Sequence, residues 1–401
     1  MTGSSDQRPG NGQRDADRAD TLIRPFRIAT PQEDLDDLRA RLERTRWPDE
    51  LPGVGWTYGV ERGYLEQLAR YWQNEYNWRR HESRLNEFPQ FTTTIDRQRI
   101  HFLHVRSPEP GAMPLIVTHG WPSSPAEFAD IIGPLTDPRT HGGDPADAFH
   151  VVAPSLPGFG FSGPTREPGW GVARVAHAWV ELMHRLGYER YGAQGTDFGS
   201  AVAPELGRIA PDRIVGVHVN ALVTASTASD PSLLDRLTEE DRAKVQANTV
   251  AWRQRSGYAT IQGTRPQTLA YALTDSPVGL LAWNLEWFVD YDAAATRQTA
   301  VDRDDLLTSV SIAWLTGTAG SSARLYYEMR EAWGAPPERS PVPTAVAVFP
   351  GDGAVRGLAE SASTITRWTV YDRGGHFAAL QAPDLLVGDI REFFRQYRHD
   401  R

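Results

Sequence analysis

The sequence contains no cysteine, which excludes disulfide bonds, thiolate nucleophiles and metal sites with cysteine ligands. A sustained run of basic residues is also missing, and the formal net charge is −9, so neither nucleic acid nor an anionic membrane surface is an expected partner. No apolar run is long enough to cross a bilayer, and the N-terminal residues lack the apolar stretch of a secretory signal. We therefore expect a soluble, cytoplasmic protein without a membrane partner.

The length of 401 residues fits one large domain with an inserted or appended part. Residues 1–23 are rich in glycine, serine, aspartate and arginine and contain few apolar residues, which predicts a disordered leader. Residues 24–90 have a helical pattern interrupted by a loop of proline and glycine, and they are too aromatic for a free linker. We expect this helical N-terminal extension to pack against the main domain.

Strand and helix patterns alternate in residues 91–221 and again in residues 340–401, which predicts an α/β core with a mostly parallel sheet flanked by helices. The core begins with two alternating segments around the polar turn 96–98, which is a hairpin signal. Between residues 222 and 339 the alternation stops, and the segment is mostly helical and rich in tryptophan and tyrosine. A helical insertion between sheet strands predicts a lid that roofs the site.

The motif Gly195-Thr196-Asp197-Phe198-Gly199 lies between a short apolar stretch and a helical pattern. Its G-x-Nu-x-G form is typical of a nucleophile elbow, a tight turn from a strand into a helix. The central residue is an aspartate, whose carboxylate would attack an electrophile and form an ester that water then cleaves. This chemistry points to an epoxide or an alkyl halide as substrate. Taken alone, Asp197 fits a helix cap better than a nucleophile, and the remaining motifs reverse that preference.

A second acid and a histidine follow in the chain. Asp352 comes just after an apolar strand pattern, and His376 follows the next one within Arg373-Gly374-Gly375-His376-Phe377. The order Asp197, Asp352, His376 is that of the α/β-hydrolase fold. We expect His376 to take a proton from water while Asp352 orients the imidazole and stabilises the imidazolium. Asp372 is the alternative acid, but it lies only four residues before the histidine and is disfavoured.

The apolar strand 114–118 ends in His119-Gly120-Trp121-Pro122. We expect the Trp121 N–H and the Phe198 N–H to form the oxyanion hole above the elbow, and we interpret His119 as a structural residue of that turn. Residues 158–163 match the dinucleotide fingerprint G-x-G-x-x-G, but no helix pattern begins inside the motif and the strand before it is not the first of the sheet. We therefore expect no organic cofactor and no metal.

Together the motifs resemble the microsomal-type epoxide hydrolases with an N-terminal helical extension, and most of all their soluble bacterial members, including those of enediyne antibiotic biosynthesis. The similarity covers nearly everything after the leader. It rests on Arg24-Pro25-Phe26, Arg46-Trp47-Pro48, His119-Gly120-Trp121-Pro122, the elbow, Gly257-Tyr258-Ala259-Thr260-Ile261-Gln262, Ser321-Ser322-Ala323-Arg324-Leu325-Tyr326 and Gly374-Gly375-His376-Phe377.

This resemblance implies that Tyr258 and Tyr326 hydrogen-bond the epoxide oxygen and protonate it as the ring opens. The product would be a vicinal diol, in an antibiotic-biosynthetic or a detoxifying role, and a homodimer would be compatible with the family. Two departures bear on the site: Asp352 stands where mammalian members often carry glutamate, and Ala313 stands where the family often carries an aromatic residue. The aromatic lid favours an apolar epoxide, such as one with an aryl group.

Two other functions are compatible with these residues. A haloalkane dehalogenase uses the same aspartate and histidine, but in that family a tryptophan usually follows the nucleophile, and Phe198 carries no donor for a halide. A non-catalytic ligand-binding protein of the same fold is the second alternative, because a fold does not determine a function. It is disfavoured because every catalytic position is filled.

Overall fold

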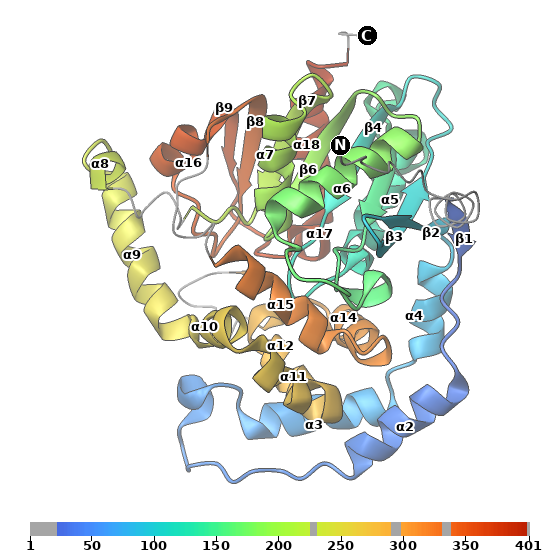
Figure 1. Ribbon diagram of the computed structural model, residues 1–401. Coiled ribbons are helices and arrows are strands. Elements are labelled where there is room, and N and C mark those ends of the chain that lie inside the picture. The colour runs from blue at the N-terminus through green and yellow to red at the C-terminus, as the bar shows by residue number, and fades with distance from the viewer. Residues whose placement is uncertain (1–21, 225–230, 290–297, 331–337, 399–401) are drawn as a thin grey trace, which may run out of the picture.

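The computed structural model describes residues 22–224, 231–289, 298–330 and 338–398. Nearly all of the leader predicted for residues 1–23 thus lies outside the described residues, as do short parts of the predicted lid. The centre of the molecule is a nine-stranded sheet with the order β1-β2-β3-β5-β4-β6-β7-β8-β9 (Figure 1). Its strands are β1 (Arg24–Phe26), β2 (Gln90–Ile95), β3 (Gln98–Val105), β4 (Met113–Thr118), β5 (Phe149–Pro154), β6 (Tyr191–Thr196), β7 (Ile214–Asn220), β8 (Ser340–Val348) and β9 (Ser363–Val370).

The six strands from β5 to β9 along that order run parallel, whereas β1, β2 and β3 are antiparallel. Helices cover both faces of the sheet, so the parallel strands are apolar on both sides. Within β4, Ile116 packs on the side of helices α6 (Val172–Arg185) and α7 (Gly199–Ile209), while Leu115 packs on the side of α5 (Ala129–Thr136) and α18 (Pro383–Arg395). This layered arrangement confirms the expected α/β-hydrolase fold.

The hairpin expected at the start of the core is present. β2 and β3 pair antiparallel with Ile95 opposite Gln98, so only two residues form the loop. Both of them, Asp96 and Arg97, have positive φ angles of 48° and 60°. Two positive φ values are typical of the type I′ turn, whose twist matches that of the flanking strands.

The N-terminal extension is not wholly helical. Arg24–Phe26 forms β1 and pairs antiparallel with Gln90–Thr92 of β2, which corrects the prediction of a helical segment over residues 24–90. The open edge of β2 offers unpaired N–H and C=O groups, and these three residues pair with its first half. Pro25 is tolerated there because β1 is the outermost strand. The rest of the extension contains α2 (Gln32–Glu43), a 3₁₀ turn (Gly55–Tyr58), α3 (Arg62–Asn74) and α4 (Trp78–Leu85).

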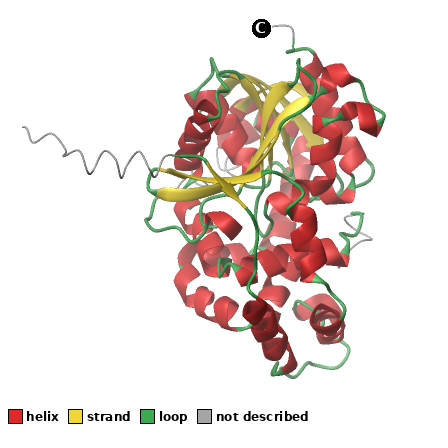
Figure 2. Ribbon diagram, turned by 90° about the vertical axis from the view of Figure 1, so that its right-hand side faces the viewer, coloured by secondary structure: helices red, strands yellow, loops and turns green. Residues whose placement is uncertain are grey.

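The predicted lid is helical where the structure describes it. Its helices are α8 (Pro231–Leu234), α9 (Glu239–Arg255), α10 (Gly257–Thr264), α11 (Pro266–Asp275), α12 (Pro277–Phe288), α14 (Arg303–Leu315) and α15 (Ala319–Met329). Most of them form a layer between the sheet and the extension, which Figure 2 shows as helices below the yellow strands, whereas α8 and α9 run up one side of the molecule toward α16 (Arg356–Ala362) in Figure 1.

The extension packs on the lid and shares one hydrophobic core with it. Three side chains of its C-terminal half also donate or share hydrogen bonds with α14: Tyr71 with Asp304, Trp72 with Ser311, and Tyr76 with Thr308. The expected packing of the extension is therefore present, and its partner is the lid. Among the described helices, none combines the length and the apolar character needed to cross a bilayer.

Candidate active site

Asp197 occupies the turn between β6 and α7. Its φ angle is 52°, a left-handed conformation that a residue other than glycine adopts only under local constraint. The constraint comes from the two flanking glycines: a Cβ atom at Gly195 would overlap the Gly199 carbonyl, and one at Gly199 would overlap the Thr118 carbonyl. The tight turn therefore requires glycine at both positions and holds the aspartate side chain above the carboxyl ends of the strands.

The carboxylate of Asp197 lies between the turn after β4 and the loop after β9. The Trp121 N–H donates to Oδ1 at 2.9 Å, and His376 Nε2 lies 3.4 Å from Oδ2. A Cβ atom at Gly120 would overlap this carboxylate, so the backbone approaches Asp197 as closely as glycine allows. Phe198, whose N–H is the other predicted oxyanion donor, follows Asp197 directly at the N-terminal end of α7.

His376 sits in a loop that the lid holds in place. Gln298 Oε1 accepts a hydrogen bond from the His376 N–H at 3.2 Å, and Thr299 forms two hydrogen bonds with the backbone of Gly374. The imidazole is mostly buried, which lowers its pKa, but the interaction with the Asp197 carboxylate, together with the charges of Asp352 and, when it is ionised, Glu127, outweighs burial and raises the pKa above its usual value. Asp197 Oδ2 lies within ion-pair distance of His376 Nε2. Within the described residues, no atom meets the stricter geometry of a hydrogen bond to His376 Nε2.

Asp352 follows β8 and accepts a hydrogen bond from the Phe349 N–H at 3.0 Å. Burial raises the pKa of its carboxyl to about 6, although His376 counteracts this effect. The two side chains interact through their charges, but in the part of the chain that the structure describes no hydrogen bond or ion pair joins them. The alternative acid, Asp372, is exposed, and its charge helps to raise the pKa of the neighbouring Arg373. The structure thus places Asp352, and not Asp372, in the electrostatic field of His376.

The two lid tyrosines face the turn that follows β4. The Trp121 ring stacks on Tyr258 at 5.2 Å between centroids and meets Tyr326 edge-on at 5.7 Å. The two tyrosine rings lie 5.6 Å apart, and a hydrogen bond between their hydroxyls lowers the pKa of Tyr258 and raises that of Tyr326. Burial is the largest influence and raises both pKa values, so both phenols keep their protons and remain donors at neutral pH.

His119 is fully buried and hydrogen-bonded on both ring nitrogens. The Leu156 N–H donates to Nε2 at 3.0 Å, which leaves the proton on Nδ1, and Nδ1 donates to the Gly120 carbonyl at 2.9 Å. Burial lowers the pKa of His119 to about 4, so the ring is neutral. These bonds link the turns after β4 and β5 and support the structural interpretation of His119. Residues 158–163 form a loop with one short 3₁₀ turn (Gly160–Ser162), as their sequence context predicted.

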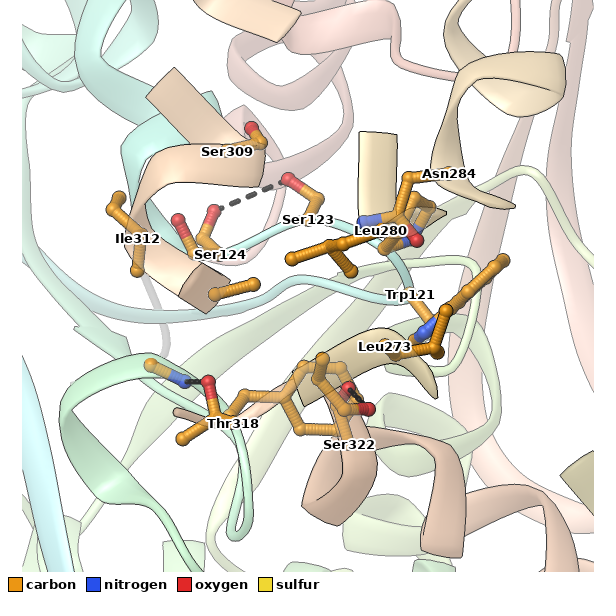
Figure 3. A pocket seen from close by; sticks show the side chains of 15 residues that line it. Trp121, Ser123, Ser124, Leu273, Leu280, Asn284, Ser309, Ile312, Thr318 and Ser322 are labelled. Carbon is orange, nitrogen blue, oxygen red and sulfur yellow. Dashed lines mark hydrogen bonds between the residues drawn. The ribbon is translucent and has the colours of Figure 1, made fainter. Parts of the chain in front are cut away.

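A small cavity lies beside Trp121. Its volume is about 20 Å³, which is room for about one water molecule. Apolar side chains such as Leu273, Leu280 and Ile312 line it together with hydroxyl and amide groups, which Figure 3 shows for Ser123, Ser124, Asn284, Ser309, Thr318 and Ser322. Neither the aspartate nor the histidine reaches it, so this cavity is a neighbour of the site.

Three residues around the site were missed by sequence reasoning. Gln298 and Thr299 form hydrogen bonds with the backbone of the histidine loop. Glu127 interacts electrostatically with both His376 and Asp197. No local pattern marks Gln298 or Thr299, because their contacts are with residues about 75 positions away. Glu127 lies only six residues after Trp121, and this proximity was the one available signal.

Comparison with known proteins places these features in a family. The model of the epoxide hydrolase N terminus matches residues 23–128, and that of the alpha/beta hydrolase fold matches residues 113–383. A homologue from Stigmatella aurantiaca is 43% identical over 380 residues, which cover 94% of this chain and 86% of its own. Epoxide hydrolase 1 of Sus scrofa is 35% identical over 420 residues, which cover 96% and 91%.

Solved structures agree with this result. The juvenile hormone epoxide hydrolase from the silkworm Bombyx mori has a TM-score of 0.81 and 29% identity, covering 94% of this chain and 95% of its own. The epoxide hydrolase of Aspergillus niger has a TM-score of 0.80 and 29% identity, covering 94% and 97%. With its elbow aspartate, its histidine loop and its tyrosine-bearing lid, the chain belongs to the epoxide hydrolase family of the α/β-hydrolase fold.

Proposed function

We propose that the protein converts an epoxide and water into a vicinal diol through an ester on Asp197. In the first step Asp197 Oδ2 attacks one ring carbon, and the carbon–oxygen bond of the ring breaks. Tyr258 and Tyr326 bind the departing oxygen, and one phenol gives it a proton, which leaves a hydroxyalkyl ester and a tyrosinate. The phenol pair and the carboxylate are all mostly buried, which strengthens these charge interactions.

In the second step water attacks the carbonyl carbon of the ester. One O–H bond of the water breaks and its proton moves to His376 Nε2, while Asp352 stabilises the imidazolium by its charge. The N–H groups of Trp121 and Phe198 stabilise the oxyanion. When the tetrahedral intermediate collapses, the imidazolium proton goes to the alkoxide of the diol, and the proton of the new Asp197 carboxyl returns to the tyrosinate through solvent.

The observation that carries this proposal is the position of the Asp197 carboxylate. One oxygen accepts the Trp121 N–H at 2.9 Å and the other lies 3.4 Å from His376 Nε2, so a single side chain adjoins a backbone N–H donor and a base. The aromatic groups above it support an apolar, aryl-bearing epoxide as substrate: Tyr258 contacts Trp252 and Trp287 as well as Trp121.

A single turnover with styrene oxide in heavy-oxygen water tests the route. In the ester mechanism the water oxygen enters the Asp197 carboxylate, so mass spectrometry of peptides from the wild type should find the label there, and the first diol should be unlabelled. The Asp197→Asn variant should form no diol and take up no label. Label that appears in the first diol and is absent from the protein would show direct attack by water and contradict the proposal.

Two further expectations belong to the proposal: a cytoplasmic location, which the sequence pattern suggested, and assembly as a homodimer, which rests on the family resemblance. Light scattering of the purified protein over a range of concentrations tests the assembly, and a monomer mass at every concentration would contradict a dimer.

A further inference from the structure

Glu127 is a buried carboxyl that the mechanism above does not use. It lies in the 3₁₀ turn Pro125–Phe128 that follows the oxyanion turn, and it is 2% exposed. The backbone around it is fixed: the Ser124 hydroxyl accepts the Ala126 N–H at 3.3 Å, and the Ser124 carbonyl accepts the Glu127 N–H at 3.1 Å. Neither carboxyl oxygen has a hydrogen-bond partner within the described residues. Such groups are rare because burial without hydrogen bonds is costly.

The surroundings of Glu127 are those of the reacting groups. His376 and Asp197 are the charged groups that face it, and the Ser123 hydroxyl interacts with its carboxyl and lowers its pKa. The Ser123 hydroxyl donates to the Ser124 carbonyl at 3.3 Å and also lines the cavity beside Trp121 (Figure 3). The turn that carries Glu127 also contacts α17 (Ala378–Gln381), which begins two residues after His376.

His376 Nε2 is, after the two oxygens of Glu127, a third buried atom of this neighbourhood without a hydrogen-bond partner in the described part of the chain. It lies 3.4 Å from Asp197 Oδ2, and it is the same atom that must take a proton from water in the second step. A water molecule has two O–H groups, so one molecule can donate to the histidine and to an oxygen of Glu127 at once. One bound water would therefore give both side chains a hydrogen-bond partner.

We propose that Glu127 is a positioning residue that holds, together with His376 Nε2, the water that cleaves the ester on Asp197. This inference rests on the function proposed above. As the water oxygen bonds to the carbonyl carbon, the O–H bond directed to His376 breaks and its proton moves to Nε2. The second O–H bond stays intact and donates to Glu127 throughout, so Glu127 neither gains nor loses a proton.

The charge state of Glu127 suits this role. Burial raises its pKa to about 8; Ser123 and His376 lower the pKa, and Asp197 raises it. The carboxyl is therefore mostly uncharged at pH 7. His376 already faces the charges of Asp197 and Asp352, and a third negative charge would keep it protonated and unable to act as a base. An uncharged carboxyl can accept the hydrogen bond of the water without that effect.

Two substitutions separate water binding from simple packing. Glu127→Met removes the acceptor at similar volume, and Glu127→Gln keeps an amide oxygen in the same place. In stopped-flow single turnovers with styrene oxide, we expect Glu127→Met to slow ester hydrolysis about tenfold or more and to change ester formation less than about twofold. Mass spectrometry should then find the ester accumulating on Asp197. Glu127→Gln should restore most of the hydrolysis rate.

Asp305→Asn is the matched control. Asp305 is another largely buried carboxyl, on α14, whose pKa burial raises to about 6, and the charged groups that face it are Asp130, Asp302, Arg84 and Asp304. We expect both chemical steps to be unchanged in this variant. A uniform decrease of both steps in Glu127→Met, or hydrolysis at the wild-type rate, would overturn the proposal.

A titration of His376 by NMR adds a readout that needs no substrate. Because Glu127 ionises near pH 8, its charge should hold part of the wild-type His376 protonated above that pH. Glu127→Met and Glu127→Gln should both remove this effect, whereas Asp305→Asn should keep it. A wild-type His376 titration above pH 8 in both Glu127 variants would contradict the placement of Glu127 beside the histidine. A wild type that forms no diol would overturn the proposed function, whereas diol formation with normal hydrolysis in Glu127→Met would overturn only the role of Glu127.

Discussion

The pair His218 and Asp389 and the candidate site are both buried clusters of histidine and carboxylate, and of these two the second has the geometry of a reactive site. In the first, His218 Nε2 lies 2.9 Å from Asp389 Oδ2, and both side chains are fully buried. Asp389 also accepts hydrogen bonds from Arg367 and from the Tyr371 hydroxyl. Burial raises the pKa of Asp389, but His218 and Arg367 outweigh it, and the net pKa is below the usual range.

The second cluster is the candidate site, where a carboxyl group as well as a histidine nitrogen is without a partner. His376 Nε2 and Glu127 lack hydrogen-bond partners among the described residues, whereas in the first cluster only His218 Nδ1 does, and burial raises the pKa of Asp352 to about 6. Both clusters contain histidine, aspartate and tyrosine, and the first adds an arginine. The hydrogen bonds to Asp389 lower the energy of its charged state and stabilise the fold, whereas the unpartnered carboxyl and imidazole of the second cluster are ready to bind substrate or water and to exchange protons.

The largest expected effect is the loss of turnover in Asp197→Asn. An amide cannot open the epoxide as a nucleophile, so we expect the rate of diol formation to fall about ten-thousandfold or more. The fold should persist, since asparagine can accept the Trp121 N–H and tolerates a positive φ. Circular dichroism checks that the fold persists, and analysis of the diol product checks the loss of turnover. Retained turnover would mean that another residue is the nucleophile.

Asp389→Asn should have the opposite effect: it should lower the stability of the fold and leave the rate of diol formation per folded molecule unchanged. The substitution removes the buried carboxylate that accepts hydrogen bonds from Arg367 and Tyr371, and leaves Glu392 as the remaining acidic partner of Arg367. We expect this to cost about 3 kcal/mol of unfolding free energy at pH 7. Because the folded-state pKa of Asp389 is depressed, its stabilisation is present above about pH 4 and is lost as pH falls further. Denaturant unfolding at several pH values measures this difference. A change in rate per folded molecule would show that the cluster is coupled to the site.

Asp352→Asn should slow ester hydrolysis about a hundredfold, because the imidazolium loses a facing charge. It should also stabilise the protein at pH 7. The folded-state pKa of Asp352 is raised to about 6, so the wild-type carboxylate costs stability above about pH 6 and costs none below about pH 4. We expect a gain of about 1 kcal/mol after allowance for solvent screening. A loss of stability at neutral pH would mean that Asp352 is paired like Asp389.

The smallest expected effects come from single hydroxyl groups. Tyr258→Phe and Tyr326→Phe should each slow ester formation about tenfold, because one of two donors to the epoxide oxygen remains. Tyr371→Phe is the matched control in the other cluster, where loss of a hydrogen bond to Asp389 should cost about 1 kcal/mol of stability and no rate. Stopped-flow tryptophan fluorescence and thermal unfolding compare the three variants. Equal losses of rate in all three would remove the distinction between the clusters.

Much of the fold could be predicted because its signals are local. Apolar runs mark β4, β5, β7 and β8, and two glycines around Asp197 mark the turn after β6, which only glycine permits. β1 could not be predicted, since three residues become a strand only when the edge of β2, more than sixty positions away, is in place. Asp197, His376 and the two tyrosines were found by motif, whereas Glu127 emerges only from burial and from its neighbours in space.

The shared core of the extension and the lid has a mechanical consequence. The lid is held on two sides, by the sheet domain above it in Figure 1 and by α2 and α3 below it, and α4 contacts its helix α14. A hinge-like swing of the whole lid would have to strip apolar surface from both layers at the same moment, and each square ångström exposed costs about 25 cal/mol. Substrate entry must therefore depend on rearrangement of single side chains and short loops, so the exchange of epoxide for diol is gated locally while the roof stays in place.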